Sequence, residues 1–470
     1  MAFSFSQQLR RRLEGTIFYG VLALIALAAV PYGTVDPWWE SLFESTIFGL
    51  AILWLVEGTL RGGWFGKEHW LLLPLLALVL FAFVQSVPFW QSNGGKALGG
   101  LTVGRTISAD PFETWRFAYK LLAITLTLGL LVRFATTEQR LRTLMYLVVG
   151  IALASALFGL VRAEMPERMA SLVGERLSTK ASYAQFENRN HFAFLIEMAI
   201  GLLLGLAIGD RKHKQRLILY IIFGVTLWAA LLLTHSRGGA LSLVVEVPFF
   251  FLLLVTVRNS SKSHGNGLQH LTSQEKLLRP RLLAKLALVT VLLAAVGTTV
   301  ILVGGDETIS RLEETAAEFE ARAAGPPKVL RPQIWQATSR LIWENPIAGV
   351  GFAGYSMAIP RYLNASGELM LEQAHNDYLE LLAGGGLIGG ALSLWFFGSF
   401  VNAARKSLRG SSPFFQAVRC GALAGLFAVA VHSFFDFGLH VTINTLVCLI
   451  LVVLAVRVCD DAAVRKQPIR

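Results

Sequence analysis

The chain has 470 residues, of which 54% are hydrophobic and 16% are charged, and its formal net charge is +11. Nucleic-acid-binding proteins are often basic, but here the lysines and arginines lie in short loops between apolar runs of about 20 residues. The positive-inside bias of membrane proteins explains this charge without a nucleic-acid partner. The composition therefore predicts an all-α polytopic membrane protein and argues against a soluble enzyme.

Apolar runs long enough to span a bilayer follow one another along almost the whole chain. We predict 12 transmembrane helices, near residues 16–33, 41–58, 69–87, 113–133, 142–162, 190–209, 217–234, 239–257, 286–304, 384–403, 414–435 and 439–457. The basic residues Arg10 to Arg12 before the first run resemble the start of a signal peptide, but we interpret this segment as an uncleaved first helix.

The loops divide into basic and non-basic sets. If the N-terminus is cytoplasmic, the inward segments together carry 25 Lys and Arg, whereas the short outward turns 33–40 and 435–440 carry none. Both termini are then cytoplasmic. The longer outward segments are 88–112, 163–189 and 305–383. The predicted organisation is helices 1 to 9 over 1–304, one large outward segment over 305–383, and helices 10 to 12 with a tail over 384–470.

The large outward segment contains two predicted helices. The first, over 306–324, is amphipathic and ends at the break Gly325 to Pro327. The second has Ile334, Thr338, Leu341 and Ile342 at helical spacing, and we expect it to lie on the outer face of the membrane.

Three cysteines are present, and none offers a pair for a disulfide or a metal site. Cys420 and Cys448 fall in apolar segments and Cys459 follows the last one. No histidine pair or Cys-x-x-Cys has the spacing of metal ligands. The sequence therefore predicts no metal and no cofactor.

The segment 186–192 begins a helix at the end of an outward loop. Asn188 or Asn190 can cap the helix, Arg189 adds a fixed positive charge, and His191 follows. A helix N-terminus with an arginine favours an anion such as phosphate. The alternative is a capped helix whose arginine reaches lipid headgroups.

The turn 234–239 is the second motif. Ser236 and Arg237 precede two glycines that permit a sharp reversal between apolar helices. An arginine at an outward hairpin runs against the positive-inside bias, which favours a function for it. A structural arginine at the membrane interface is the alternative.

The third motif, 374–380, ends the large outward segment and precedes three glycines. A neutral His375 imidazole there can accept a proton from a hydroxyl group. Asn376 and Asp377 are near enough in sequence to orient it. The alternative is a structural histidine at the start of a helix.

Four further charged residues lie in or beside apolar runs. Arg116 and Lys120 share one helix face and can hold a lipid phosphate or contact ordinary headgroups. Glu197 and Glu246 lie within predicted membrane helices, and we interpret each as the buried partner of an arginine rather than as part of a proton path.

The motifs together resemble the bacterial O-antigen ligase and polymerase superfamily. The shared features are the Asn-Arg-Asn-His start at 188–191, the Ser-Arg-Gly-Gly turn at 236–239, the stretch 331–355 and the sequence HNDYLELLAGGGLIGG at 375–390. The resemblance spans roughly 180–400, and it is more specific for the superfamily than for one member.

The resemblance implies a GT-C-like glycosyltransferase in the bacterial inner membrane, with its active site facing the periplasm. It implies a donor glycan linked to undecaprenyl pyrophosphate and an acceptor that is a glycan or lipid A-core. It maps phosphate-binding arginines onto Arg189 and Arg237 and the catalytic histidine onto His375. Arg331 is then a third phosphate contact or the partner of a local acid.

Several functions fit this resemblance. Transfer to lipid A-core defines a ligase, transfer to another lipid-linked repeat defines a polymerase, and transfer to protein defines an O-oligosaccharyltransferase. A lipid-linked sugar flippase is the alternative from another class. A flippase needs charge along a central path, whereas the predicted site residues gather at one face.

Overall fold

The computed structural model of the chain describes residues 2–30, 32–63, 69–88, 90–91, 104–165, 177, 181–210, 213–263, 331–363, 371–409 and 412–457. The predicted membrane helix 286–304, the amphipathic helix 306–324 and the break at Gly325 to Pro327 lie outside these residues, as does Cys459.

Helices dominate the described chain, as the apolar runs predict. Eleven of the predicted spans coincide with the helices α1 (Ala2–Ala28), α2 (Pro37–Arg61), α3 (Leu73–Ser86), α4 (Pro111–Phe134), α5 (Glu138–Glu164), α7 (Arg189–Gly209), α8 (Lys214–Leu233), α9 (Arg237–Ser263), α14 (Asp377–Arg409), α15 (Pro413–His432) and α16 (Thr442–Val456). Eight helices among the described residues are long and apolar enough to cross a membrane, while α3 and α16 are shorter apolar helices. The all-helical, multi-pass class is confirmed, and the total of twelve spans stays a prediction.

Local sequence sets where several of these helices begin. Asp110 caps α4 by accepting a hydrogen bond from the Glu113 backbone N–H at 3.0 Å, and Thr137 caps α5 through the N–H of Arg140. A proline occupies the first turn of α2, α4 and α15, where its missing N–H costs no hydrogen bond.

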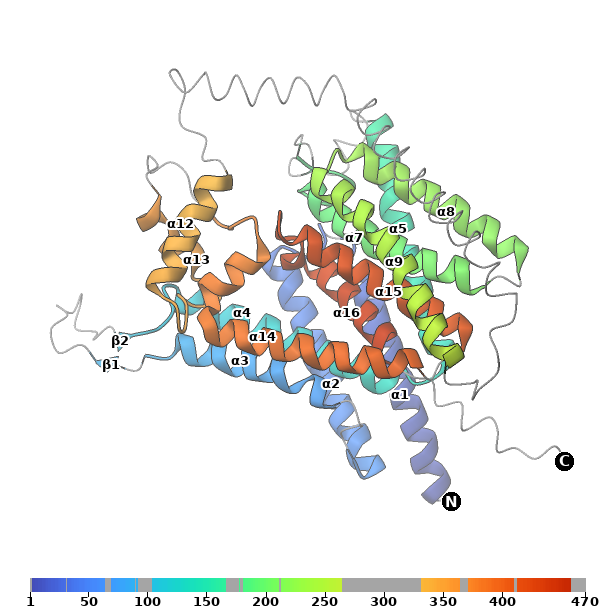
Figure 1. Cartoon of the computed structure of the whole chain (residues 1–470). Helices are drawn as coiled ribbons and strands as arrows, with labels where there is room; N and C mark the ends of the chain where they lie inside the picture. The colour runs from blue at the N-terminus through green and yellow to red at the C-terminus, as the bar shows by residue number, and fades with distance from the viewer. Residues whose placement is uncertain are drawn as a thin grey trace, which may run out of the picture.

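Helix α7 packs most closely against α15 and also contacts α5, α8 and α9 (Figure 1). Glycines make this approach possible, since a Cβ on Gly201 would lie 2.7 Å from the carbonyl oxygen of Gly421. Almost every residue from His191 to Leu203 is buried. The first residues of α7 are therefore held by a rigid, fully packed helix.

The part of the large outward segment that is described forms a small body at one end of the bundle. It contains α12 (Arg331–Glu344), α13 (Tyr355–Ala358) and the 3₁₀ helix η5 (Ile359–Tyr362). Figure 1 shows these helices on the left, near the short antiparallel strands β1 (Trp90–Gln91) and β2 (Gly104–Arg105). The remaining 3₁₀ turns are η1 (His69–Leu71) and η6 (Gly438–His440).

The predicted second helix of this segment is confirmed as α12, and its position on the outer face of the membrane stays a prediction. Its buried residues include Ile334, Thr338 and Leu341. Leu341 packs in a core with Tyr355 and Ile359, and the Thr338 hydroxyl lies 2.7 Å from that of Tyr355. The apolar face of α12 therefore contacts protein, and Trp343, 83% exposed, lies on the other side.

Helix α14 begins at Asp377, seven residues before the predicted span, and it is broken at Gly386. That glycine has φ 56° and ψ −156°, a conformation that is essentially restricted to glycine. The break exposes backbone groups to the loop after α12, and the N–H groups of Leu387 and Ile388 donate to the carbonyls of Pro346 and Ile347. The outward segment is thus bonded directly into the broken helix.

Candidate active site

The N-terminus of α7 is organised by its two asparagines in different ways. The Asn188 side chain caps the helix by accepting a hydrogen bond from the N–H of Asn190 at 2.9 Å. The Asn190 amide instead donates to the Asp436 carboxylate at 2.5 Å, across 246 positions of sequence. The cap predicted for this helix is confirmed, and the second asparagine has a bonding role that the sequence did not indicate.

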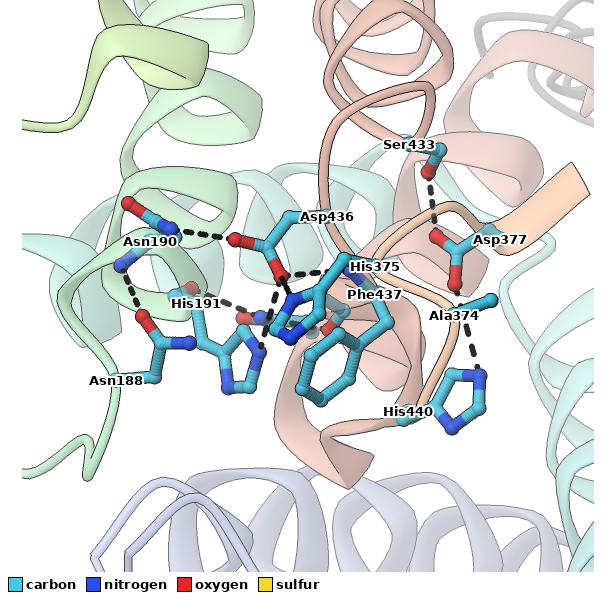
Figure 2. A network of polar contacts seen from close by, with 12 residues as sticks. Asn188, Asn190, His191, Ala374, His375, Asp377, Ser433, Asp436, Phe437 and His440 are labelled. Atoms are coloured by element: carbon cyan, nitrogen blue, oxygen red, sulfur yellow. Dashed lines mark hydrogen bonds and ion pairs between the residues drawn. The ribbon is translucent and has the colours of Figure 1, made fainter. Parts of the chain in front are cut away.

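Asp436 lies at the centre of a polar cluster that we call the Asp436 cluster, made of Asn190, His191, Arg331, His375 and Asp436. Figure 2 shows Asn190, His191 and His375 around Asp436. Oδ1 of Asp436 lies 3.6 Å from Nδ1 of His375 and 4.0 Å from Nε2 of His191. Oδ2 lies 3.5 Å from the guanidinium of Arg331. Residues from four separate helix ends therefore meet at one carboxylate.

The carboxylate of Asp436 is only 2% exposed. Burial alone would raise its pKa. The contact with His375, the nearby His191, and hydrogen bonds from the Phe437 N–H and the Asn190 amide outweigh burial and hold the pKa below its usual range. Asp436 is thus a buried anion compensated by several surrounding donors.

His375 is held in an unusual backbone conformation on the other side of this anion. Its φ is 51°, in the left-handed region that non-glycine residues seldom occupy. The neighbouring backbone is fixed, because the N–H of Ala374 donates to Glu380 and the N–H of Asp377 donates to the Ser433 carbonyl. The side chain remains 33% exposed. Strain of this kind is often maintained where a side chain must point into a site.

The expected orienting role of Asn376 and Asp377 is wrong. Asn376 caps α14 by accepting hydrogen bonds from the N–H groups of Tyr378 and Leu379. Asp377 accepts a hydrogen bond from Ser433 at 2.7 Å and lies 3.6 Å from the His440 imidazole. The carboxylate beside His375 is Asp436, which comes from a different helix end.

Phe437 fills the space between the histidines. Its ring centroid lies 5.1 Å from that of His375, 4.8 Å from that of His191 and 5.8 Å from that of His440 (Figure 2). It separates the Asp436 cluster from a second polar group made of Asp377, Glu380 and His440. The two groups thus share one aromatic wall.

Arg189 and Arg237 each begin a helix, α7 and α9, at the end of the bundle that carries the cluster. The N–H of Arg189 donates to the Ala181 carbonyl at 2.7 Å. Arg237 is exposed, and the next residue, Gly238, lies against His432 at the end of α15. Ser236 accepts a hydrogen bond from the N–H of Gly239 and so caps α9. Convergence of the two guanidinium groups on one anion stays a prediction.

The remaining candidate cations have acidic partners. Arg331 contacts Asp436, so the local acid foreseen as its alternative partner belongs to the cluster itself. Arg116 pairs with Glu113 at 3.0 Å. Lys120 pairs with Glu40 at 2.5 Å and also donates to the His440 carbonyl.

The buried carboxylate Glu197 has a partner, but that partner is not an arginine. Oε1 of Glu197 lies 2.7 Å from Nδ1 of His432. Glu246 faces α7, because a Cβ on Gly201 would lie 2.4 Å from its Oε1. The expected arginine partner of Glu197 is therefore corrected to a histidine.

Sequence reasoning missed Asp436, Phe437 and His432. A usable signal was present, since the short outward turn 435–440 has no Lys or Arg and yet contains an aspartate and a histidine. Among the residues that the structure describes, no group of three or more His, Cys, Asp or Glu is arranged to hold a metal ion.

These observations define the class: an all-helical, multi-pass membrane protein with a polar cluster where several helices end together. Residues 222–394 match the protein-family model described as O-antigen ligase. The match confirms the resemblance to the O-antigen ligase superfamily, and it covers Arg237, Arg331 and His375 but neither Arg189 nor Asp436. No curated protein was found to match the chain.

Proposed function

We propose that this protein is a glycosyltransferase of the O-antigen ligase type. It transfers a glycan from undecaprenyl pyrophosphate to an acceptor hydroxyl at the periplasmic face of the inner membrane. The observation that carries the proposal is the pair of His375 and Asp436, 3.6 Å apart, beside the helix ends that bear the arginines. The family match over 222–394 supports the class of reaction.

In the proposed reaction His375 is the general base. Its Nδ1 faces Asp436, so its Nε2 is the nitrogen left to receive a proton. An oriented imidazole beside a buried carboxylate is a proven arrangement for this task, because the carboxylate stabilises the imidazolium that forms. The acceptor oxygen attacks the anomeric carbon as its proton moves to Nε2. The bond from that carbon to the pyrophosphate oxygen breaks with inversion, and the electron pair leaves on the phosphate.

The leaving pyrophosphate gains negative charge as this bond breaks. We assign its neutralisation to Arg189 and Arg237, with Arg331 as a third cation next to the base. Guanidinium groups at helix N-termini stabilise such charge through paired N–H donors. The proposed step needs no metal, so a chelator such as EDTA should leave the rate unchanged.

The charged groups on the two sides of Phe437 differ, so we place the donor on one side of this ring and the acceptor on the other. The Asp436 cluster includes Arg331 and adjoins the N-terminus of α7, which favours the anionic donor. On the other side His440 lies 3.6 Å from both Asp377 and Glu380. The charge of Asp436 is offset by Arg331 and by its hydrogen-bond donors. Asp377 and Glu380 instead place two carboxylates around one imidazole, and carboxylates repel a pyrophosphate but accept hydrogen bonds from sugar hydroxyls. We therefore place the acceptor on the side of Asp377.

The test uses purified protein in nanodiscs with a lipid-linked glycan as donor. His375→Ala should lower turnover about 10²–10⁴-fold, the usual contribution of a general base, and leave donor binding largely intact. His213→Ala is the matched control, because His213 also lies beside an aspartate, Asp210, at 3.9 Å but at the other end of the bundle. A near-normal product ladder from well-folded His375→Ala protein would refute the proposed base.

The acceptor is identified by offering lipid A-core, a second lipid-linked repeat and an acceptor protein in parallel. A ligase, a polymerase and a protein O-oligosaccharyltransferase each use one of these. In cells, a deletion strain that accumulates single repeats indicates a polymerase, whereas full-length unligated polymer indicates a ligase.

A further inference from the structure

A second ionisable group lies beneath the Asp436 cluster, where α7, α9 and α15 pack together. It contains Glu197, Glu246 and His432, and each is at most 1% exposed. Glu197 and His432 are directly bonded, with 2.7 Å between Oε1 and Nδ1. The His432 ring is also stacked on Phe194, with 4.1 Å between centroids and 19° between planes. The imidazole is thus held by a bond on one edge and by an aromatic ring on its face.

Burying such a pair inside a membrane helix bundle is costly, because both groups give up their hydration. Apolar residues of similar volume would pack at least as well. His432 bonds Asp436 only through its backbone carbonyl, which accepts a hydrogen bond from the Asp436 N–H at 3.1 Å, and any residue could supply this bond. The two side chains are better explained by what packs against them.

The first turn of α9 packs against this pair through two glycines. A Cβ added to Gly238 would lie 2.4 Å from Nε2 of His432, and one added to Gly239 would lie 2.8 Å from Cβ of Ala193 and 3.3 Å from Oε1 of Glu197. The backbone of α9 therefore lies directly on the imidazole and beside the carboxylate. These two residues immediately follow Arg237.

The preceding turn holds the same backbone from outside. Ser236 accepts a hydrogen bond from the N–H of Gly239 at 3.2 Å, and Thr234 accepts one from the N–H of Ser236 at 3.1 Å. His235 between them has φ 52°. The peptide that carries Arg237 is consequently fixed by a cap on one side and by the Glu197–His432 pair on the other.

We propose that Glu197 and His432 are positioning residues that act through Arg237, by holding the first turn of α9 so that the guanidinium meets the donor pyrophosphate. The inference rests on the proposed function, since it assumes that Arg237 binds the donor. Without the Glu197 bond, the His432 ring is free to turn on Phe194, and the glycine backbone loses the surface that fixes it. Donor binding should weaken, while proton transfer at His375 should not.

The primary variant is Glu197→Gln, which keeps the volume of the side chain but replaces the carboxyl group that bonds His432 with an amide. Binding of undecaprenyl pyrophosphate to protein in nanodiscs should weaken roughly tenfold, as expected when one buried hydrogen bond is disrupted. The KM for the donor should rise with it, and kcat should fall as well, because Arg237 also neutralises the charge on the leaving group. The KM for the acceptor should stay near its original value. Glu57→Gln is the matched control, because Glu57 is equally buried and bonded to Arg133 at 2.9 Å at the other end of the bundle.

A double-mutant cycle with Arg237→Ala separates the positioning role from a general loss of stability. If the pair acts through Arg237, Glu197→Gln should cause no further loss of undecaprenyl pyrophosphate binding in the Arg237→Ala background. A further tenfold loss there would overturn this inference and leave the proposed function standing. Unchanged binding in Arg237→Ala itself would instead overturn the proposed donor site.

Gly238→Ala provides a second approach that leaves both residues of the pair unmutated, should Glu197→Gln fail to fold. Its Cβ would displace the His432 ring, so donor binding should again weaken in the wild-type background and not in Arg237→Ala. A fall in kcat with donor binding preserved, in any of these variants, would contradict the role given to Arg237 and indicate an effect through the α15 turn that carries Asp436.

Discussion

At the scale of single residues, Asp436 provides the negative charge on which the other residues of the cluster converge. A buried carboxylate that accepts hydrogen bonds from Asn190 and the Phe437 N–H retains its charge at neutral pH, because these donors replace the water that it has lost. A permanent negative charge 3.6 Å from Nδ1 of His375 favours the tautomer with its proton on that nitrogen. The opposite nitrogen is then a proton acceptor.

Asp436→Asn tests this link between charge and tautomer. An amide offers no negative charge to the imidazolium, so kcat should fall about 10²–10⁴-fold while donor binding changes little. Asp210→Asn is the control, because Asp210 also lies beside a histidine and an arginine, at the other end of the bundle. A kcat within a few-fold of the wild type would contradict the role of Asp436.

The depressed pKa of Asp436 also determines how its contribution to stability varies with pH. A carboxyl with a lowered pKa stabilises the fold fully above its unfolded pKa of about 4, and loses this effect as the pH falls through the folded pKa. The difference in melting temperature between the wild type and Asp436→Asn should therefore be constant from pH 8 to pH 5. A difference that shrinks within that range would show that Asp436 titrates there.

The arginines predicted to bind the donor differ from lysine in geometry rather than in charge. Arg189→Lys and Arg237→Lys each retain a cation but lose the planar pair of donors that matches a phosphate. Activity should fall roughly tenfold or more in each, with the loss shared between a higher KM for the donor and a lower kcat, because the same groups neutralise the leaving pyrophosphate. Arg142→Lys is the control, because Arg142 pairs with Glu138 at the start of α5, away from the cluster. Equal loss in all three variants would argue against a specific phosphate site.

At the scale of elements, the break in α14 is what joins the outward segment to the bundle. Gln85 of α3 is fully buried and holds the break, as its amide donates to the carbonyls of Ala348 and Gly384 at 2.7 and 2.8 Å. Its oxygen accepts a hydrogen bond from the N–H of Phe352 at 3.2 Å. One side chain thus adds three hydrogen bonds to the direct backbone bonds between these two elements, such as the bond from the Gly351 N–H to the Gly384 carbonyl at 3.0 Å.

Gln85→Leu should destabilise the protein by about 2 kcal/mol, since it leaves buried backbone groups without a partner. Thermal unfolding in detergent measures the effect, and the expected change is a lower melting temperature. Thr226→Val is the control, because the exposed Thr226 hydroxyl bonds only the Ile222 carbonyl of its own helix. A melting temperature equal to that of the control would show that the loop is held by other contacts.

The sequence predicts elements well here because a membrane demands long apolar runs, and those runs mark α2, α7 or α15 without any tertiary information. It also predicts Asn188 as a helix cap, because a cap bonds a backbone N–H only two or three residues further along the chain. Asp436 is different, because its partners come from positions up to 246 residues away. The partner of Glu197 is likewise set by the packing of α7 on α15, and a pattern within one segment contains no information on it.

At the scale of the whole molecule, the polar contacts are divided between the two ends of the bundle. The Asp436 cluster, the Ser236 cap and the start of α14 lie together at one end. The pairs Glu57–Arg133 and Asp210–Arg216 lie at the other ends of α2, α4 and α7. The inward bias of lysine and arginine predicts that the second end faces the cytoplasm and that the cluster lies at the outer face.

This assignment can be tested with single cysteines in a variant that lacks Cys420, Cys448 and Cys459. Trp343 of α12 is 83% exposed, and the His213 side chain, at the start of α8, is 58% exposed. A maleimide that cannot cross the inner membrane should label Trp343→Cys in spheroplasts, and it should label His213→Cys only after that membrane is permeabilised. Positions 320 and 265, which lie outside the described residues, should follow the same pattern. Labelling of Trp343→Cys and His213→Cys from one side would contradict the topology, and with it the periplasmic location on which the choice of donor depends.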